Sequence, residues 1–372
     1  MFDAVKATSR MERRLSIEIA RARSSLEADC KRAELAAYRA RLGYFQQASD
    51  ALAVLRQKNQ HTREVLLSAW IHLAQGILSY FSDVGVSKTD GVQRAHALCL
   101  AAGLHQLRST CAAWLAQWDY SRVDMEALSS HVREALQAAG SENHSARSRA
   151  NLVGAQALHV SGRPDLAQIW YRRSREHAIA DCDDATISAL MHNMAWLRML
   201  CMRQLVFTGR GDVGAGRHAM MNAESNAHFD EMVGDSSWHE LKPILRAQIV
   251  SLQGDAAAAL ALYQEHLAEA MKAARLQAYL LADKAWCHAQ VGHLDEARNT
   301  AQLAIQSLTE ETHVDDRAAA HSRLAHTFSL IGDASLEQSH LALAESDWAD
   351  HCTMQVKAVE LLSRVCEDGS TG

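Results

Sequence analysis

Proline is almost absent from this chain, and its scarcity limits the possible folds more than any other feature. Only 2 Pro and 18 Gly occur in 372 residues, where ordinary usage of about 5% Pro and about 7% Gly would give roughly 19 and 26. Sandwiches, barrels and Pro-rich linkers need more chain breakers than this. Alanine, the strongest helix former, supplies 65 residues. The sequence therefore predicts an all-α protein.

The composition predicts a folded cytoplasmic protein without a membrane span. Hydrophobic residues make up 48% of the chain and charged residues 22%, enough to bury a sizeable core. The longest purely apolar run, residues 256–263, is far shorter than the roughly 18 to 20 residues that a bilayer requires. The N-terminus has no apolar signal core. The 8 Cys form no Cys-x-x-Cys pair, so we expect reduced thiols.

Short breaks recur between segments with helical periodicity, at a mean spacing of about 41 residues. Each interval holds two helical patterns and one tight turn, which predicts a series of helical hairpins. A turn glycine ends the first helix in a left-handed conformation, and an Asp that follows it can cap the second helix. The breaks are Gly43, Gly85, Asp119-Tyr120, Gly162, Gly211, Gly254, Gly292 and Gly332.

Small residues flank these breaks in a way that resembles the tetratricopeptide repeat family. That pattern has a small residue in the first helix, Gly at the turn, a small residue early in the second helix and an aromatic residue four positions later. Ala155, Gly162, Ala167 and Tyr171 fit it. The spacing exceeds the usual period of about 34 residues, as in bacterial regulatory members with longer helices.

The resemblance implies a right-handed α-solenoid of about eight hairpins. We expect one superhelix over residues 1–372. Its expected parts are a basic amphipathic N-terminal helix region (1–42), the repeats (43–350), a capping helix (351–366) and a polar tail (367–372).

A superhelix of this family binds a protein or peptide ligand on its concave face, so the resemblance implies a regulatory binding scaffold. The first helix of each hairpin lines that face in the family. Aligning the repeats by their turn glycines places six partner-binding candidates there: Arg149, Gln156, Asn193, Gln248, Trp286 and His326.

The N-terminal region carries a second candidate site. Residues 1–60 hold 12 Lys/Arg against 7 Asp/Glu, whereas residues 231–372 hold 10 against 21. If residues 10–41 form one helix, five arginines share one face; they are Arg10, Arg14, Arg21, Arg32 and Arg39. This basic strip is either a solvated face or a docking surface for an acidic partner, including the acidic C-terminal half of a second copy. Interspersed acidic residues and the lack of aromatics disfavour nucleic acid.

Motifs for catalysis, cofactors or metals are weak. Gly209, Gly211 and Gly214 spell a dinucleotide-binding fingerprint, but that motif requires a preceding strand, and residues 191–207 have a helical pattern. The histidine pairs 288/293 and 321/326 lack zinc-ligand spacing. Asp183 or Asp184 is interpreted as a helix cap. We therefore expect no enzyme, cofactor or metal.

Three alternatives remain open from the sequence. The chain could be the sensor part of a larger signalling protein with a cyclase, kinase or DNA-binding effector. It could instead be a self-associating assembly factor, which would use the basic strip and the acidic half. The least supported alternative is a nucleotide- or metal-dependent enzyme that uses residues 209–214 or the histidines.

Overall fold

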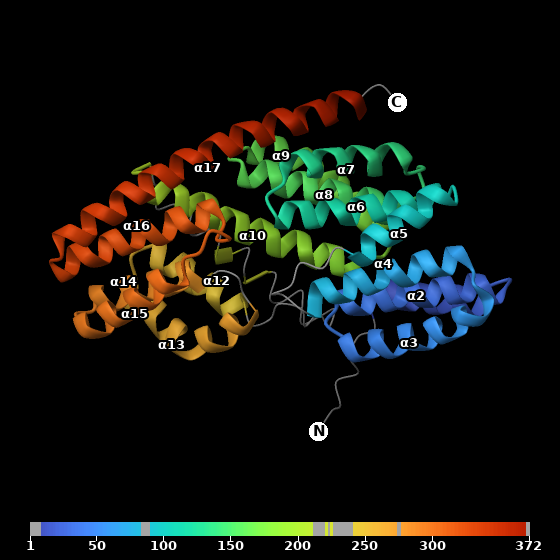
Figure 1. Ribbon diagram of the computed structural model, residues 1–372, viewed down its shortest axis with the longest axis horizontal. Helices are drawn as coiled ribbons and strands as arrows, with labels where there is room; N and C mark the ends of the chain where they lie inside the picture. Colours follow the sequence, from blue (N-terminus) through green and yellow to red (C-terminus); the bar gives the residue numbers. More distant parts are fainter. Residues whose placement is uncertain are drawn as a thin grey trace.

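The protein is described by a computed structural model that covers residues 9–82, 90–210, 220–221, 224–225, 241–273 and 277–369. These residues form sixteen helices with defined bounds and contain no β-strand, so the expected all-α class is confirmed (Figure 1). The first ten helices are α1 (Arg10–Arg21), α2 (Ser25–Arg41), α3 (Phe45–Thr62), α4 (Val65–Ser82), α5 (Asp90–Ala101), α6 (His105–Ser121), α7 (Met125–Ala138), α8 (His144–Val160), α9 (Pro164–Ala180) and α10 (Asp184–Phe207). The remaining six are α12 (Lys242–Leu252), α13 (Ala256–Ala273), α14 (Gln277–Gln290), α15 (Leu294–Ser307), α16 (Val314–Ile331) and α17 (Ala334–Gly369).

Consecutive helices pack in pairs, and the first helices of neighbouring pairs also contact one another. The pairs are α2/α3, α4/α5, α6/α7, α8/α9, α12/α13, α14/α15 and α16/α17. Contacts between first helices join α2 to α4, α6 to α8 and α14 to α16. These pairs therefore bury apolar surface against a neighbouring pair as well as within themselves, and α10 connects α8/α9 to α12.

Most of the turns expected from the sequence lie inside these pairs. Gly332 ends α16 in the left-handed conformation with a φ of 84°, and Asp333 then accepts a hydrogen bond from the Leu336 N–H at the start of α17. The other expected turn glycines with positive φ are Gly43, Gly162, Gly254 and Gly292. Gly85 and Gly211 lie outside the described residues.

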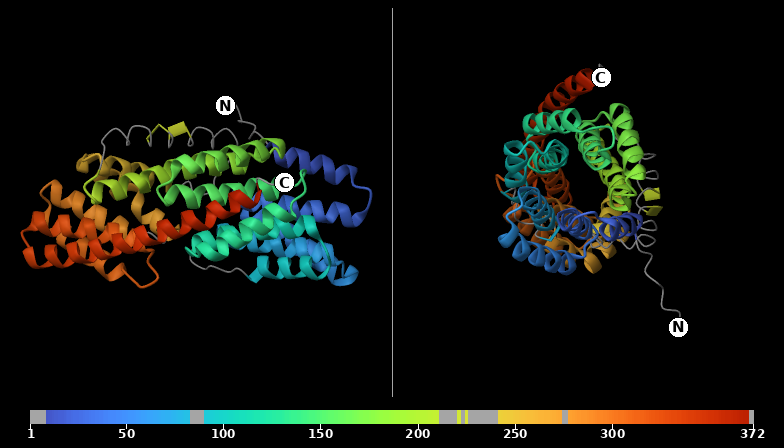
Figure 2. Two further views of the ribbon diagram at one scale, coloured as in Figure 1. Left: turned by 90° about the horizontal axis from the view of Figure 1, so that it is seen from above. Right: turned by 90° about the vertical axis from the view of Figure 1, so that its right-hand side faces the viewer.

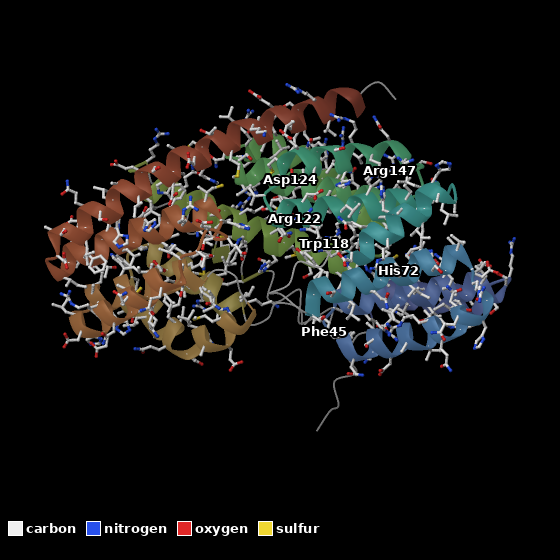
Figure 3. All side chains as sticks on the ribbon, viewed as in Figure 1. Phe45, His72, Trp118, Arg122, Asp124 and Arg147 are labelled. Carbon is white, nitrogen blue, oxygen red and sulfur yellow. The ribbon has the colours of Figure 1, made fainter. Side chains whose placement is uncertain are left out.

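One expected break is misplaced. Asp119 and Tyr120 belong to α6, and the turn to α7 comes after them, where Val123 has a φ of 60°. Arg122 and Asp124 lie at this turn (Figure 3), and Asp124 caps α7 by accepting from the Ala127 N–H. The sequence pattern placed the break too early because no glycine marks this left-handed position.

Small residues let the paired helices approach closely, as expected. Ala155 and Ala167 are fully buried between α8 and α9. Gly154 on α8 lies so close to Trp170 on α9 that an added Cβ would be 2.6 Å from the indole ring. A side chain larger than alanine at position 155 or 167, or any side chain at position 154, would force the helices apart.

The chain closes on itself at two places, and this closure determines what the interior contains. At the N-terminal end, Leu15, Tyr38 and Leu42 from α1, α2 and the turn after α2 pack with Ala185 at the start of α10. At the other end, α17 crosses back to pack on α7 and α8, where the Gln355 side-chain amide donates to the Val160 carbonyl. Viewed end-on, the helices surround a central region (Figure 2).

Two expected segment boundaries are wrong. The separate capping helix at 351–366 is the second half of α17, which runs unbroken from Ala334 to Gly369. The single N-terminal helix at 10–41 is two helices, because Ser24 accepts from the Glu27 N–H and Glu27 reaches back to the Arg23 N–H. This Ser-x-x-Glu capping arrangement starts a new helix.

One helix, α4, is long and apolar enough to cross a membrane by length and composition alone. In this structure it packs against α2, α3 and α5, and Leu67, Ile71 and Leu73 are buried in the core.

Candidate functional site

The interior of the molecule holds most of the residues expected on the concave face. Arg149, Gln156, Gln248 and Trp286 are all buried, while Asn193 is half-buried and His326 is exposed. The four buried side chains do not form an open groove, because the closure by α1, α2 and α17 brings the first helices to face one another. Neither polar atom of the Gln248 amide has a hydrogen-bond partner.

The C-terminal interior cluster consists of Ser251, Tyr263, Asp283, Trp286 and Arg323. The Arg323 Nε donates to the Asp283 carboxylate at 2.5 Å, and the Tyr263 hydroxyl donates to the other oxygen at 2.6 Å. Ser251 bonds to both charged groups. The Arg323 guanidinium lies 3.9 Å from the centre of the Trp286 ring. Every charge in this cluster is paired, so it stabilises the contact between α12, α14 and α16.

A second paired cluster joins α10 to α16. Arg203, which is 1% exposed, contacts Asp315 and Asp316 at 2.8 Å each. Ligand atoms of His313, Asp315 and Asp316 lie within 4.8 Å of one another, a spacing that could hold a metal ion. Two of these three groups already contact the Arg203 guanidinium, whose single positive charge the two carboxylates share. Burial and the neighbouring Asp315 raise the pKa of Asp316 to about 6.

The N-terminal interior cluster consists of Arg41, Trp114, Arg149, Asp183 and Thr186. Arg41 forms two hydrogen bonds to the Asp183 carboxylate, at 2.8 and 2.9 Å, and a third to the Thr186 hydroxyl. Asp183 also caps α10 through the Thr186 N–H, as the sequence suggested. The pair ties α2 to the start of α10 across the interior.

Arg149 is the exception in this cluster. Its side chain is buried, with 7% of the residue exposed, and its guanidinium lies 4.2 Å from the centre of the Trp114 ring. It makes no ion pair or hydrogen bond with the rest of the described chain. Burial and the nearby Arg41 charge lower the pKa of Arg149 to about 9. An unpaired charge in such a position is destabilising.

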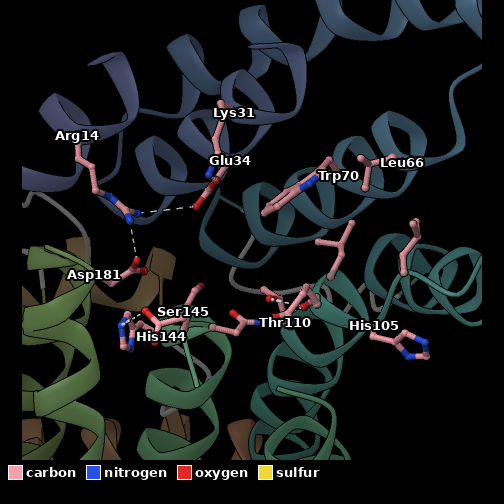
Figure 4. Close-up of a pocket in the computed structure, with 15 residues that line it drawn as sticks. Arg14, Lys31, Glu34, Leu66, Trp70, His105, Thr110, His144, Ser145 and Asp181 are labelled. Atoms are coloured by element: carbon pink, nitrogen blue, oxygen red, sulfur yellow. Dashed lines mark hydrogen bonds and ion pairs between the residues drawn. The ribbon is translucent and has the colours of Figure 1, made fainter. Parts of the chain in front are cut away.

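A cavity of about 480 Å³ opens at the end of the molecule nearest this cluster. We call it the mouth; Figure 4 shows it between α1 and α2 on one side and the starts of α6 and α8 on the other. Its apolar wall is formed by Leu66, Trp70, Leu104 and Leu107. The mouth therefore offers an apolar surface large enough for a side chain or a small ligand.

The N-terminal ends of α6 and α8 supply part of the polar wall. His105, Thr110, His144 and Ser145 all line the mouth. Asn143 caps α8, whereas no side chain caps the first turn of α6. Free N–H groups and the positive end of the helix dipole favour negative groups at such helix starts.

Charged side chains from α1, α2 and the α9–α10 connection complete the mouth. Arg14 contacts Asp181 at 2.9 Å, and Lys31 contacts Glu34 at 2.9 Å, so positive and negative charge balance within each pair. Arg14 also lies 4.0 Å from Glu34 (Figure 4). The second oxygen of Asp181 is buried without a hydrogen-bond partner. Burial, opposed by Arg14, raises the pKa of Asp181 to about 7.

The arginines of the expected basic strip are divided between α1 and α2 and do not form one face. Four of them are paired within the chain: Arg10 with Asp184, Arg14 with Asp181, Arg32 with Asp29 and Arg39 with Glu12. Arg21 is exposed at the end of α1. The strip thus serves largely to hold α1 against α2 and against the start of α10.

Comparison with known proteins gives no family. No protein-family model matches the chain, and no curated protein matches it. The glycine motif that begins at Gly209 follows α10 directly, so a helix and not a strand precedes it; Gly211 and Gly214 lie outside the described residues.

The sequence pattern predicts that Arg149 belongs to a binding surface, but it does not predict the mouth. Lys31, Glu34, His105 and His144 come from three helices that the sequence gives no reason to associate. One feature of the sequence could have indicated the mouth. In each repeat the second connection leads into a first helix, so several helix starts lie at the same end of a stack.

Proposed function

We propose that the protein is a regulatory binding module with a TPR-like superhelical architecture, which takes a peptide or a protein segment at the mouth. The mouth carries this proposal, because it combines an apolar wall, paired charges and helix starts in one cavity of about 480 Å³. Ligand sites typically combine apolar walls with a few convergent polar groups in this way. The mouth replaces the open concave face as the expected binding surface.

The position of the mouth also supports a regulatory role. Arg14 on α1 reaches across it to Asp181, between α9 and α10, so one ion pair links two ends of the N-terminal half. A ligand that competes for either partner would change how α1 is held against the rest of the chain. A binding event that favours one of two arrangements shifts their populations, and this is how the module would signal.

The test is selection of binders from a random peptide library, followed by calorimetry. Ser145→Trp places an indole in the mouth without touching the Asn143 cap, and Gln168→Trp places one on the exposed face of α9 as the matched control. We expect selected peptides to bind the wild type and Gln168→Trp equally, and to bind Ser145→Trp at least about tenfold more weakly, or ~1.4 kcal/mol. Equal affinity for all three proteins would contradict the proposal, as would a selection that yields no binder.

A further inference from the structure

Arg149 lies one helical turn along α8 from a residue that lines the mouth. Ser145 on α8 and Thr110 on α6 line the cavity, and Arg149 and Trp114 follow each of them by four residues on the same helix. Residues four apart share a helix face, and Cα–Cβ bonds tilt toward the helix N-terminus. Both side chains therefore lean from the interior toward the mouth.

The charges around Arg149 leave it without a counterion. Three carboxylates stand in the nearby α9–α10 connection and the first residue of α10, and each has its own arginine: Asp181 pairs with Arg14, Asp183 with Arg41 and Asp184 with Arg10. The N-terminal interior cluster therefore contains two guanidiniums and one carboxylate. It carries a surplus positive charge in a buried position.

The surroundings of the guanidinium are aromatic. Trp114, on which Arg149 stacks, makes edge contacts with Tyr80, Phe81 and Trp118 at ring-centre distances of 6.0 to 6.5 Å. A planar guanidinium can stack on a ring and still present its N–H groups in the plane to a carboxylate. An arginine in such surroundings suits a negative group attached to an apolar body.

We propose that Arg149 binds the carboxylate of a ligand that enters through the mouth, either the C-terminus of a peptide or a small carboxylic acid with an apolar body. This inference rests on the proposed function and names the group that the site recognises. The carboxylate would accept two parallel N–H bonds from the guanidinium and cancel the surplus charge. The apolar wall at Trp70 would receive the remainder of the ligand.

The acidic groups of the mouth do not oppose this. Asp181 and Glu34 are each held by a cation from α1 or α2, and the uncapped start of α6 adds free N–H donors. Glu142 is 91% exposed and its charge is screened by solvent.

The test compares carboxylates with their amides on the full chain by thermal unfolding and calorimetry. The probes are the tripeptide Ala-Ala-Phe, its C-terminal amide, 3-phenylpropionate and 3-phenylpropanamide. A ligand that binds only the folded protein raises its Tm. We expect both carboxylates to raise the Tm and both amides to bind at least about tenfold more weakly. If only the peptide acid binds, the source is a peptide terminus; if both acids bind, small carboxylic acids are also ligands.

Variants assign the effect to Arg149. Arg149→Met keeps an unbranched side chain but removes the guanidinium, so it should abolish the preference for acids over amides, whereas Arg149→Lys should keep part of it. Arg173→Met on the exposed face of α9 is the matched control and should behave as wild type. Should Arg149→Met fail to fold, Ser145→Trp closes the route with Arg149 intact and should remove the effect of the acids.

Three results would overturn the inference: equal binding of acids and amides, an undiminished preference in Arg149→Met, or no effect of either acid at any soluble concentration. Failure here is distinct from failure of the proposed function. If peptides bound at the mouth regardless of their C-terminal group, carboxylate recognition by Arg149 would be refuted, but the proposed binding function of the mouth would not.

Discussion

Two arginine–tryptophan stacks in the interior show how similar packing can have opposite consequences. Arg149 lies 4.2 Å from the Trp114 ring centre in the N-terminal half, and Arg323 lies 3.9 Å from the Trp286 ring centre in the C-terminal half. Both arginines are buried. Arg323 is fixed by Asp283, whereas Arg149 has no carboxylate.

The difference can be traced to one helix position. Asp283 stands three residues before Trp286, and Cys111 stands three residues before Trp114. The buried Cys111 thiol instead neighbours Cys99 on α5, and both cysteines are free. One half therefore uses its arginine as part of the core, and the other leaves its arginine available, at a site next to the mouth.

The largest expected effect is at the paired arginine. Arg323→Met would leave the Asp283 carboxylate buried with only Tyr263 and Ser251 as partners. Breaking one side of a buried ion pair typically lowers stability by about 3–5 kcal/mol. Urea denaturation should show a loss of this size. A loss below about 1 kcal/mol would mean that the C-terminal interior cluster is not the structural core we describe.

Arg41→Met should have a smaller effect, of about 2 kcal/mol, although Arg41 also pairs with a buried aspartate. The Arg149 guanidinium lies close enough to Asp183 for this carboxylate to oppose the lowering of the Arg149 pKa, so Arg149 can partly replace Arg41. The double variant Arg41→Met/Arg149→Met should therefore lose more stability than the two single changes together. If the stability changes of the two single variants added up to that of the double variant in a double-mutant cycle, Arg149 would not interact with Asp183, which would contradict this prediction.

Arg149→Met alone should leave the stability of the unliganded protein unchanged or raise it by about 1 kcal/mol, because it removes an unpaired buried charge. The lost contact with Trp114 offsets part of this gain. Urea denaturation should therefore show changes in the free energy of unfolding that differ between the two variants, a loss for Arg323→Met and no loss for Arg149→Met. This difference would show that Arg323 is a core residue and that Arg149 is not. If Arg149→Met lost as much stability as Arg323→Met, Arg149 would be a core residue as well, which would contradict this interpretation.

The last prediction concerns pH and Asp181 in the wall of the mouth. Burial raises the pKa of Asp181 from 3.8 to about 7, so the folded chain binds this proton more tightly than the unfolded chain. The contribution of Asp181 to stability therefore falls as pH rises from about 4 to about 7. Asp181→Asn lacks this titration, so its stability relative to wild type should increase over that range. A difference that is flat with pH would show that Asp181 is not a strained buried acid.

The local features of the fold could be predicted, and the long-range ones could not. Turn glycines such as Gly162 and contact alanines such as Ala155 follow from the chemistry of one hairpin. The start of α2 was also readable, because Ser24 and Glu27 form a capping motif that the five-arginine pattern obscured. The turn at Val123 was not, since a non-glycine residue in the left-handed region leaves no mark in a single sequence.

The site depended on contacts that no local pattern records. The pairing of Arg41 with Asp183 joins residues 142 positions apart, and α17 reaches back to α7 and α8. These contacts close the interior, which is why Arg149 and Trp286 are buried and not displayed on an open face. The repeat pattern indicates which helix faces point inward but not how far the stack curves.

The most direct test of the account is the unfolding free energy of wild type and Arg149→Met, each measured with and without Ala-Ala-Phe. Without the tripeptide, the variant should be at least as stable as wild type. With the tripeptide the order should reverse, because the wild type gains more binding energy than the variant. The same difference between the two proteins in both conditions would contradict a carboxylate receptor at Arg149.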